Sequence, residues 1–458
     1  MAKKIISPFA FCAINIAAVL GLKELPIMAT LGLESIFFFL FVALFFFIPF
    51  SLIVAELGST CPSYGGIYSW VKAEYNKNLG FFAIWLYWIK NIIGYPMALS
   101  IFASIILYVI SPNLATNKYL IVIIMLSAYW FCTVVNFYGI KLSKSIITWG
   151  VIIGTVIPIL LIIILTIFWL MQGNQSDIKF TIHSFLPYSL SKQNLALMLS
   201  IVFGYSGIEM SAAYIKDLEN PRKNYPLTIF ISLFFILLMS ILPTLGIAIV
   251  INKGNINFVS SFIIAISIFL NKFKLHYLIF YLATSVSLGM LTNMFTWIVG
   301  PSKSLLKSTS DGCLPKFMQK TNRYDVPTNI VIIQGIVVTC FSFVFVFSPT
   351  INESYWILIN VAAILYVIIV ILLILSAISA RFKNKNFILQ HHYQVPGGMI
   401  GLLFIGGVCM ATCVLVLIFS FIPPANININ NPFLYETILI ALLTCFIMSP
   451  IIIRKIAK

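Results

Sequence analysis

Long apolar runs separated by short polar segments dominate the pattern of the chain. A helix that crosses the roughly 30 Å hydrocarbon core of a bilayer needs about 20 apolar residues at a rise of 1.5 Å per residue, and each run is long enough. The pattern therefore predicts an all-α membrane protein with about 12 transmembrane helices. The runs cover residues 6–29, 33–56, 79–110, 119–139, 146–171, 195–215, 227–251, 276–304, 328–349, 354–380, 398–422 and 433–453.

Composition agrees with a membrane protein. Of the 458 residues, 61% are hydrophobic and only 9% are charged, whereas soluble domains carry about 25% charged residues. Because so few charges cannot cover a water-exposed surface, we expect a single transmembrane domain over residues 1–458. Two shorter stretches, 65–77 and 257–273, have the pattern of amphipathic helices that lie at the membrane interface.

The distribution of basic residues predicts the orientation. The net charge is +16, with 28 Lys and Arg. With a cytoplasmic N-terminus, 20 of these 28 fall in cytoplasmic segments and 6 in outer segments, while Lys23 and Lys90 lie within apolar runs. Basic loops mark the cytoplasmic side, and an even number of spans returns the chain to it. We expect both termini in the cytoplasm, and no nucleic acid partner, because the positive charges are scattered through loops.

Two apolar runs contain residues that interrupt a helix. The first run has Gly21 and Pro26, and the sixth has Gly204 and Gly207. Interrupted spans in matching positions of two halves indicate an inverted-repeat transporter with its site at the membrane midplane. The pattern predicts two five-helix repeats, 6–171 and 195–380, with discontinuous helices 1 and 6, followed by two extra helices in 398–453. The alternative is that both runs hold ordinary glycine kinks.

Broken helices expose backbone groups that suit an amino acid. Free N–H groups bind a carboxylate, and free carbonyl groups bind an ammonium. Backbone of this kind persists at membrane depth only where it lines a cavity or is buried in protein.

Four ionisable residues lie away from the ends of the apolar runs, and each has two interpretations. Glu209 is a proton sensor or carrier, or a hydrogen-bonding post that holds the broken helix. Lys90 pairs with a carboxylate of the protein or with one of the substrate. Lys23 and Glu24 neutralise each other or attract opposite ends of a substrate, unless Lys23 extends to the interface.

Other chemistry finds little support in the sequence. The four histidines lie in loops or at the ends of runs, and no nucleophile–base pair, metal-ligand spacing or phosphate-binding loop is visible. We expect no enzyme activity, no metal and no cofactor. The eight cysteines lie mostly inside apolar runs and do not indicate a disulfide framework.

Short motifs in a fixed order carry a family resemblance. With these motifs the chain resembles the amino acid–polyamine–organocation superfamily, and within it the glutamate/γ-aminobutyrate antiporter branch. The motifs are Ala55-Glu56-Leu57-Gly58 with Pro62, Gly65-Gly66 and Trp70-Val71; Gly207 to Ala212 with Asn220-Pro221 and Tyr225-Pro226; Trp297 to Lys303; Val326-Pro327; Pro396-Gly397-Gly398; and Phe421 to Pro424.

The resemblance implies roles for particular residues. It implies that Val19, Leu20 and Gly21 bind the substrate carboxylate, and that the segment of Phe203, Gly204, Tyr205 and Ser206 contacts the amino group. Glu209 matches a glutamate of span six. The remaining candidate substrate-binding residues are Gly207, Trp297, Tyr366 and Asn293, and, from their position within the spans, Lys23, Glu24 and Lys90.

Three positions depart from the branch that the chain resembles. Asn293 stands where an acidic residue is common, Val370 replaces a second tyrosine of span ten, and Lys23 takes a position that is often tyrosine. These changes put the exchanged pair of that branch in doubt for this chain. They move the charge of the site toward attracting carboxylates.

The expected function is secondary active transport of amino acids across the bacterial inner (cytoplasmic) membrane, by antiport. The alternatives are proton-coupled amino acid uptake and a nutrient receptor that has lost transport. We expect an amino acid or amine substrate and the lipid bilayer as partners, and leave a homodimer open.

Overall fold

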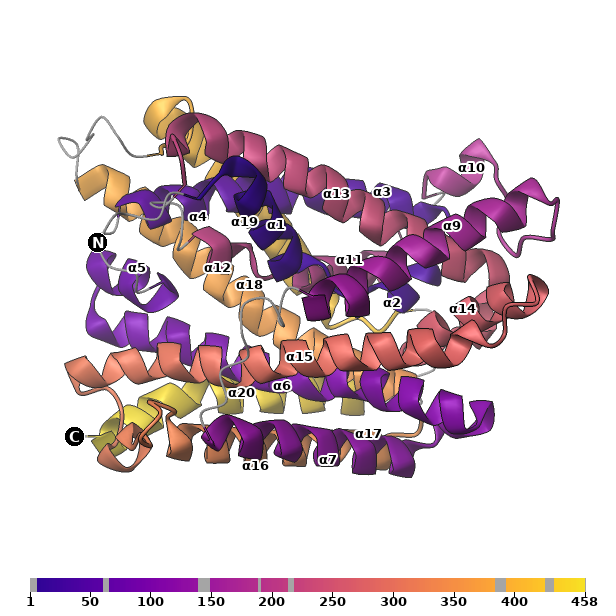
Figure 1. Cartoon of the computed structure of the whole chain (residues 1–458). Coiled ribbons are helices and arrows are strands. Elements are labelled where there is room, and N and C mark those ends of the chain that lie inside the picture. The colour runs from indigo at the N-terminus through magenta and orange to yellow at the C-terminus, as the bar shows by residue number, and fades with distance from the viewer. Residues whose placement is uncertain are drawn as a thin grey trace.

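The computed structural model describes residues 6–60, 66–138, 149–187, 191–212, 218–383, 393–424 and 432–457. Within these ranges the fold is built from helices that run roughly side by side, and no strand is formed. The two chain ends lie at the same end of the bundle (Figure 1), which we call the terminal end. Pro62 and Gly65 of the first motif lie outside the described residues.

The helices of the first part of the chain lie on both sides of the bundle. They are α1 (Pro8–Val19), α2 (Leu25–Ala29), α3 (Glu34–Val42), the π-helix η1 (Ala43–Phe47), α4 (Ile48–Thr60), α5 (Gly66–Glu74), α6 (Lys77–Ile110), η2 (Pro112–Thr116), α7 (Lys118–Phe137), the π-helix η3 (Ile152–Val156) and α9 (Ile157–Met171). Of these, α1, α3 and α4 lie on one side, and α6 and α7 lie on the other (Figure 1).

The second part continues with helices on both sides of α6. They are α10 (Ile182–Phe185), α11 (Lys192–Gly204), α12 (Ile208–Ala212), α13 (Pro221–Val250), η5 (Lys253–Asn255), α14 (Ser261–Lys272), α15 (Leu278–Leu306), η6 (Lys307–Asp311), η7 (Lys316–Gln319), α16 (Thr328–Ser342), α17 (Val344–Phe347), α18 (Ile351–Lys383), α19 (Gly398–Ser420) and α20 (Pro432–Ala457).

Polar residues between the apolar runs start several helices. The side chain of Asn76 accepts hydrogen bonds from the first N–H groups of α6, and Asn117 does the same for α7. Ser7 and Ser191 cap α1 and α11 in the same way. Such caps satisfy N–H groups that have no partner inside the helix, so the interruptions of the apolar pattern coincide with helix starts.

Ten helical stretches among the described residues are long and apolar enough to cross a membrane. α6 and α18 pack against each other in the centre and are largely buried. Phe131, Phe234 and Phe404 are instead 59%, 61% and 72% exposed on the outside of the bundle. Extended apolar surface of this kind suits lipid and not water, so the fold is that of a multi-pass membrane protein.

The first and the sixth of the predicted apolar runs are each divided into two helices by a break of three residues or more. The run 6–29 forms α1 and α2, separated by residues 20–24, and the run 195–215 forms α11 and α12, separated by residues 205–207. We call these separations the first break and the second break. The predicted discontinuity of both helices is therefore present, while the amphipathic stretches 65–77 and 257–273 form α5 and α14.

Small residues bring the neighbouring helices close to the breaks. Gly154 in η3 lies against Gly289 in α15 so tightly that a Cβ on Gly154 would lie 2.3 Å from the Gly289 Cα. Small residues permit this close backbone approach between membrane helices. The contact fixes α15 beside η3 and so positions Asn293 and Trp297 near the breaks.

Candidate functional site

The first break leaves part of the backbone without helical hydrogen bonds. Leu20 N–H still donates to the Ile16 carbonyl at 2.8 Å, and its ψ of 124° turns the chain out of the helix. In the described part of the chain, the backbone N–H groups of Gly21, Leu22 and Lys23 make no backbone hydrogen bond. Those N–H groups are free to bind an anion or water.

The second break is held by a side chain of the following helix. Gly207 N–H donates to Glu209 Oε2 at 3.0 Å, and the φ of Gly207 is +123°, a conformation that favours glycine. A Cβ on Gly207 would lie 2.3 Å from the Ala18 carbonyl oxygen. The two breaks therefore touch each other, and glycine is required at the contact.

A cavity of about 150 Å³ lies where the breaks meet α6 and α15. This volume is small for a ligand pocket and suits a molecule of amino acid size. Ten of the predicted site residues line it: Val19, Leu20, Gly21, Lys23, Lys90, Phe203, Gly204, Ser206, Asn293 and Trp297.

Four of the predicted substrate-binding residues do not line this cavity. Tyr205 points to α3, where its hydroxyl donates to the Phe39 carbonyl at 3.3 Å. Gly207 packs on Ala18, and Tyr366 lies behind Lys90. Glu24 packs over the second break, since a Cβ on Gly204 would lie 3.0 Å from its carboxyl carbon.

One face of α6 contributes cavity residues that the sequence analysis did not single out. Gly94, Ala98 and Ile101 line the cavity together with Lys90. They follow Lys90 at spacings of 4, 8 and 11 residues, which place side chains on one face of a helix. The helical period counted from Lys90 is therefore a sequence signal that predicts these three residues. Asn91, Tyr95, Thr155, Met290 and Met294 also line the cavity.

Lys90 is almost completely buried beside three aromatic rings. Its ammonium lies 5.1 Å from the ring centre of Tyr87, 5.4 Å from that of Phe203 and 4.9 Å from that of Tyr366. It also donates a hydrogen bond to Ser206 Oγ at 3.2 Å. Rings at these distances attract a cation by about 2 kcal/mol or more when water is excluded.

Glu209 connects the second break to α18. Its Oε2 accepts hydrogen bonds from Gly207 N–H and, at 3.1 Å, from the Tyr366 hydroxyl, while Oε1 has no hydrogen-bond partner among the residues that the structure describes. Glu209 is 2% exposed and does not line the cavity. A buried carboxylate oxygen without a partner is costly unless a proton or a cation reaches it.

Lys23 and Glu24 make no ion pair with each other, although they are neighbours in the first break. Among the described residues, no carboxylate lies within 4.0 Å of the Lys23 ammonium, which lies instead 4.9 Å from the centre of the Phe203 ring. The Tyr355 hydroxyl donates to the Lys23 carbonyl at 3.2 Å and so anchors the break to α18. Lys23 is therefore turned toward the cavity.

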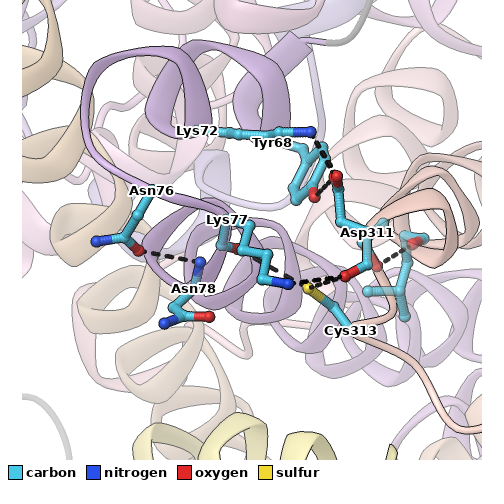
Figure 2. A network of polar contacts seen from close by, with 9 residues as sticks. Tyr68, Lys72, Asn76, Lys77, Asn78, Asp311 and Cys313 are labelled. Carbon is cyan, nitrogen blue, oxygen red and sulfur yellow. Dashed lines mark hydrogen bonds and ion pairs between the residues drawn. The ribbon is translucent and has the colours of Figure 1, made fainter.

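A polar network lies at the terminal end of the bundle. Figure 2 shows Tyr68 and Lys72 of α5 reaching Asp311 at the end of η6. Lys72 Nζ lies 2.7 Å from Asp311 Oδ1 and 2.6 Å from Oδ2, and the Tyr68 hydroxyl donates to Oδ2. These hydrogen bonds hold the pKa of Asp311 below its usual value. We call Tyr68, Lys72 and Asp311 the terminal-end network.

Two further ion pairs join segments at this end. Arg381 in α18 donates to both carboxylate oxygens of Glu56 in α4, with Nε at 2.8 Å from Oε1. Glu56 Oε2 also accepts from Val395 N–H at 2.8 Å, which joins α4 to the segment before α19. Lys383 lies 4.0 Å from Glu74 of α5. Direct contacts between opposite charges thus link α4 and α5 to α18, and α5 to η6, at the terminal end.

Comparisons with known proteins agree with this architecture. The sequence model of the amino acid permease family matches residues 6–443. An uncharacterized transporter of Legionella pneumophila is 35% identical over 453 residues, which cover 99% of this chain and 97% of that protein.

Two relatives in Lactococcus lactis are named for antiport. A glutamate/gamma-aminobutyrate antiporter is 29% identical over 462 residues, covering 100% of this chain and 91% of that protein. A probable agmatine/putrescine antiporter is 23% identical over 351 residues, which cover 74% of this chain and 72% of that protein. The predicted family is confirmed: the chain belongs to the amino acid permease family of membrane transporters.

Proposed function

We propose that the protein is a secondary active transporter that exchanges amino acids by alternating access about the two breaks. The observation that carries this proposal is the contact of the breaks at one cavity, which brings free backbone groups and two lysines together. The N–H groups of the first break suit a substrate carboxylate, and carbonyl and hydroxyl groups of the second suit an ammonium.

The proposed architecture is twelve spans in a five-plus-five inverted repeat. The ten long apolar helices and the two divided runs support the number. In the proposed arrangement 6–171 and 195–380 are the repeats, each beginning with a divided helix, and α19 and α20 in 398–453 follow them. The bias of basic residues supports a cytoplasmic location of both termini in a bacterial inner membrane.

The charges at the cavity favour a substrate with a free carboxylate. Lys23 and Lys90 line the cavity, whereas Glu24 and Glu209 do not, and Asn293 contributes an uncharged amide. We therefore propose that neutral or acidic amino acids are preferred over diamines such as cadaverine. Two charges about 6 Å apart at an effective dielectric constant of 20 interact by roughly 3 kcal/mol, which is enough to set this preference.

Proton-coupled uptake is the second candidate, and Glu209 favours it. The partnerless Oε1 of Glu209 is a site that a proton would satisfy. Under this alternative, the proton on Glu209 travels with the amino acid. Under antiport, Glu209 keeps the second break in place through Gly207 and Tyr366.

Counterflow into proteoliposomes tests the function. Liposomes with purified protein are loaded with one unlabelled amino acid, and uptake of labelled glutamate, γ-aminobutyrate, neutral amino acids or agmatine is followed. We expect internal amino acid to accelerate uptake, with agmatine the poorest substrate. Uptake into empty liposomes that requires an imposed proton gradient would favour symport. Binding without any flux would indicate a receptor.

A further inference from the structure

The surroundings of Lys90 have the composition of an ammonium-binding site. Three rings and one hydroxyl surround its ammonium, with Tyr87 and Lys90 on α6, Phe203 and Ser206 beside the second break, and Tyr366 on α18. Aromatic cages of this kind bind alkylammonium ligands. Here the group in the cage belongs to the protein. We call Tyr87, Phe203, Ser206 and Tyr366 the cage.

The cage lies between the cavity and Glu209. Lys90, Phe203 and Ser206 line the cavity, whereas Tyr87, Tyr366 and Glu209 do not. The ring of Tyr366 contacts the Lys90 ammonium, and the hydroxyl of Tyr366 donates a hydrogen bond to Glu209. Lys90 interacts electrostatically with Glu209 without forming an ion pair within 4.0 Å. The lysine side chain thus separates the cavity from a buried carboxylate.

Two polar atoms behind Lys90 point to a site for a cation. Within the described residues, Glu209 Oε1 and the Tyr87 hydroxyl are buried and have no hydrogen-bond partner. Tyr87 and Glu209 are 1% and 2% exposed. Without the charge of Lys90, the carboxylate would keep only uncharged partners, the Gly207 N–H and the Tyr366 hydroxyl, and a buried charge without a compensating opposite charge is costly.

We propose that Lys90 is a tethered occupant of an ammonium site, and that this occupancy excludes amine substrates from the cavity. With Lys90 in the cage, a second cation meets like charge from Lys90 and Lys23. With the lysine truncated, the cage and Glu209 accept a free primary alkylammonium. The proposal rests on the proposed function for its consequence in transport, while the cage itself is tested by direct binding.

Chemical rescue tests the proposal. Lys90→Ala removes three methylene groups and the ammonium, and n-propylammonium contains the same atoms. Binding of n-propylammonium to detergent-solubilised protein is measured by calorimetry, with thermal unfolding as a second readout. We expect its Kd to be at least tenfold lower for Lys90→Ala than for the wild type. We also expect n-propylammonium to raise the unfolding temperature of the variant alone.

Matched controls separate the cage from a simple void. Lys23→Ala also removes a lysine beside Phe203, but that lysine contacts a single ring, so no gain is expected. In Lys90→Ala, n-propanol should bind at least tenfold more weakly than n-propylammonium. Adding Glu209→Gln should remove most of the gain. Lys90→Ser also removes the ammonium from the cage, and it replaces Lys90→Ala in these measurements if Lys90→Ala does not fold.

The outcomes distinguish the cage from the transport function. Equal Kd values for n-propylammonium in the wild type and both truncated variants would overturn the proposal, as would equally tight binding of n-propanol. A Lys90→Ala variant that binds n-propylammonium while the wild type shows no amino acid flux would support the cage and reject the proposed function. Normal wild-type counterflow, together with no tighter binding of n-propylammonium in the variants, would support the proposed function and reject the cage.

Discussion

In the middle of the bundle, Lys90 and Glu209 are 3% and 2% exposed and make no direct ion pair. At the terminal end, Lys72 and Asp311 are 41% and 20% exposed and lie 2.6 Å apart. The surface pair follows the usual arrangement, in which opposite charges are in direct contact and contribute about 0–1 kcal/mol to the stability of the fold. The central charges instead rely on rings, hydroxyls and backbone N–H groups.

This difference in pairing fits a structural role for the surface charges and the role that we propose for the central ones. A charge at the centre of a bilayer costs about 2.5–3.5 kcal/mol or more, and direct pairing of Lys90 with Glu209 would lower that cost. The pair stays apart, with Tyr366 between them. Charges held apart in this way remain available to a substrate, a proton or an ammonium ion, whereas Asp311 is already fully engaged by Lys72 and Tyr68.

The largest effect is expected for Gly207→Ala. Its Cβ would overlap the Ala18 carbonyl oxygen at 2.3 Å, and alanine rarely adopts a φ of +123°. We expect loss of counterflow to background and a destabilisation of about 1–3 kcal/mol. Flux and thermal unfolding of the purified variant measure both effects.

Two other glycines serve as matched controls for Gly207. Gly300→Ala in α15 places its Cβ in open space, and Gly21→Ala meets its nearest atom, Lys23 Cε, at 3.6 Å. Both should fold and transport, while Gly21→Leu should fill the cavity and stop flux in a folded protein. Wild-type transport by Gly207→Ala would show that the contact of the breaks is not needed.

The next largest effect concerns Glu209. Glu209→Gln keeps an oxygen that can accept from Gly207 and Tyr366, but it cannot exchange a proton. If Glu209 carries or senses the proton, we expect about tenfold slower transport that no longer varies with external pH. Proteoliposome flux at several pH values provides the measurement.

Tyr366→Phe is the control for the structural role of Glu209. It removes one hydrogen bond to Glu209 and leaves the carboxyl group and the ring beside Lys90. We expect its pH profile to keep the wild-type shape. A Glu209→Gln variant with an unaltered pH profile would identify Glu209 as a hydrogen-bonding post.

A smaller effect is expected for Lys23→Gln, which tests the sign of the site. Removing about a third of a 3 kcal/mol interaction changes affinity roughly fivefold. We expect glutamate to bind about fivefold more weakly, and a neutral amino acid to be affected less. Competition for counterflow gives both affinities. Unchanged affinity for both substrates would mean that Lys23 does not act on the substrate.

The sequence predicted the breaks and the charged groups near the middle of the membrane, because glycine and ionisable residues stand out in apolar runs. It also indicated Lys23, Lys90 and Asn293 as candidate substrate-binding residues, and all three line the cavity. Their roles in binding stay predictions. Gly94, Ala98 and Ile101 were missed although the helical period from Lys90 contains them.

Side-chain direction and distant contacts could not be predicted. Its position beside Lys23 favours Glu24 as the partner of that lysine, yet Glu24 packs against Gly204 at the end of α11. Lys72 and Asp311 are 239 residues apart, and each is one of many charges in polar segments. Periodicity along a helix says which residues share a face, but it does not say which distant segment meets that face.

The smallest effect is expected in the terminal-end network. Asp311→Asn removes the charge that Lys72 and Tyr68 contact. Because the pair is partly exposed, we expect the free energy of unfolding to fall by only about 0.2–1 kcal/mol.

The pH dependence of this effect follows from the pKa of Asp311, which is lowered in the folded protein. The contribution of Asp311 to stability is therefore present above the ordinary aspartate pKa of about 3.9 and is lost as pH falls through the folded value. Wild type and Asp311→Asn should therefore differ in thermal stability at pH 7 and converge once the pH falls below the lowered pKa of Asp311. Asp177→Asn, an exposed aspartate outside the described ion pairs, should match the wild type throughout. A constant difference down to that pH would assign the effect to packing and not to the charge.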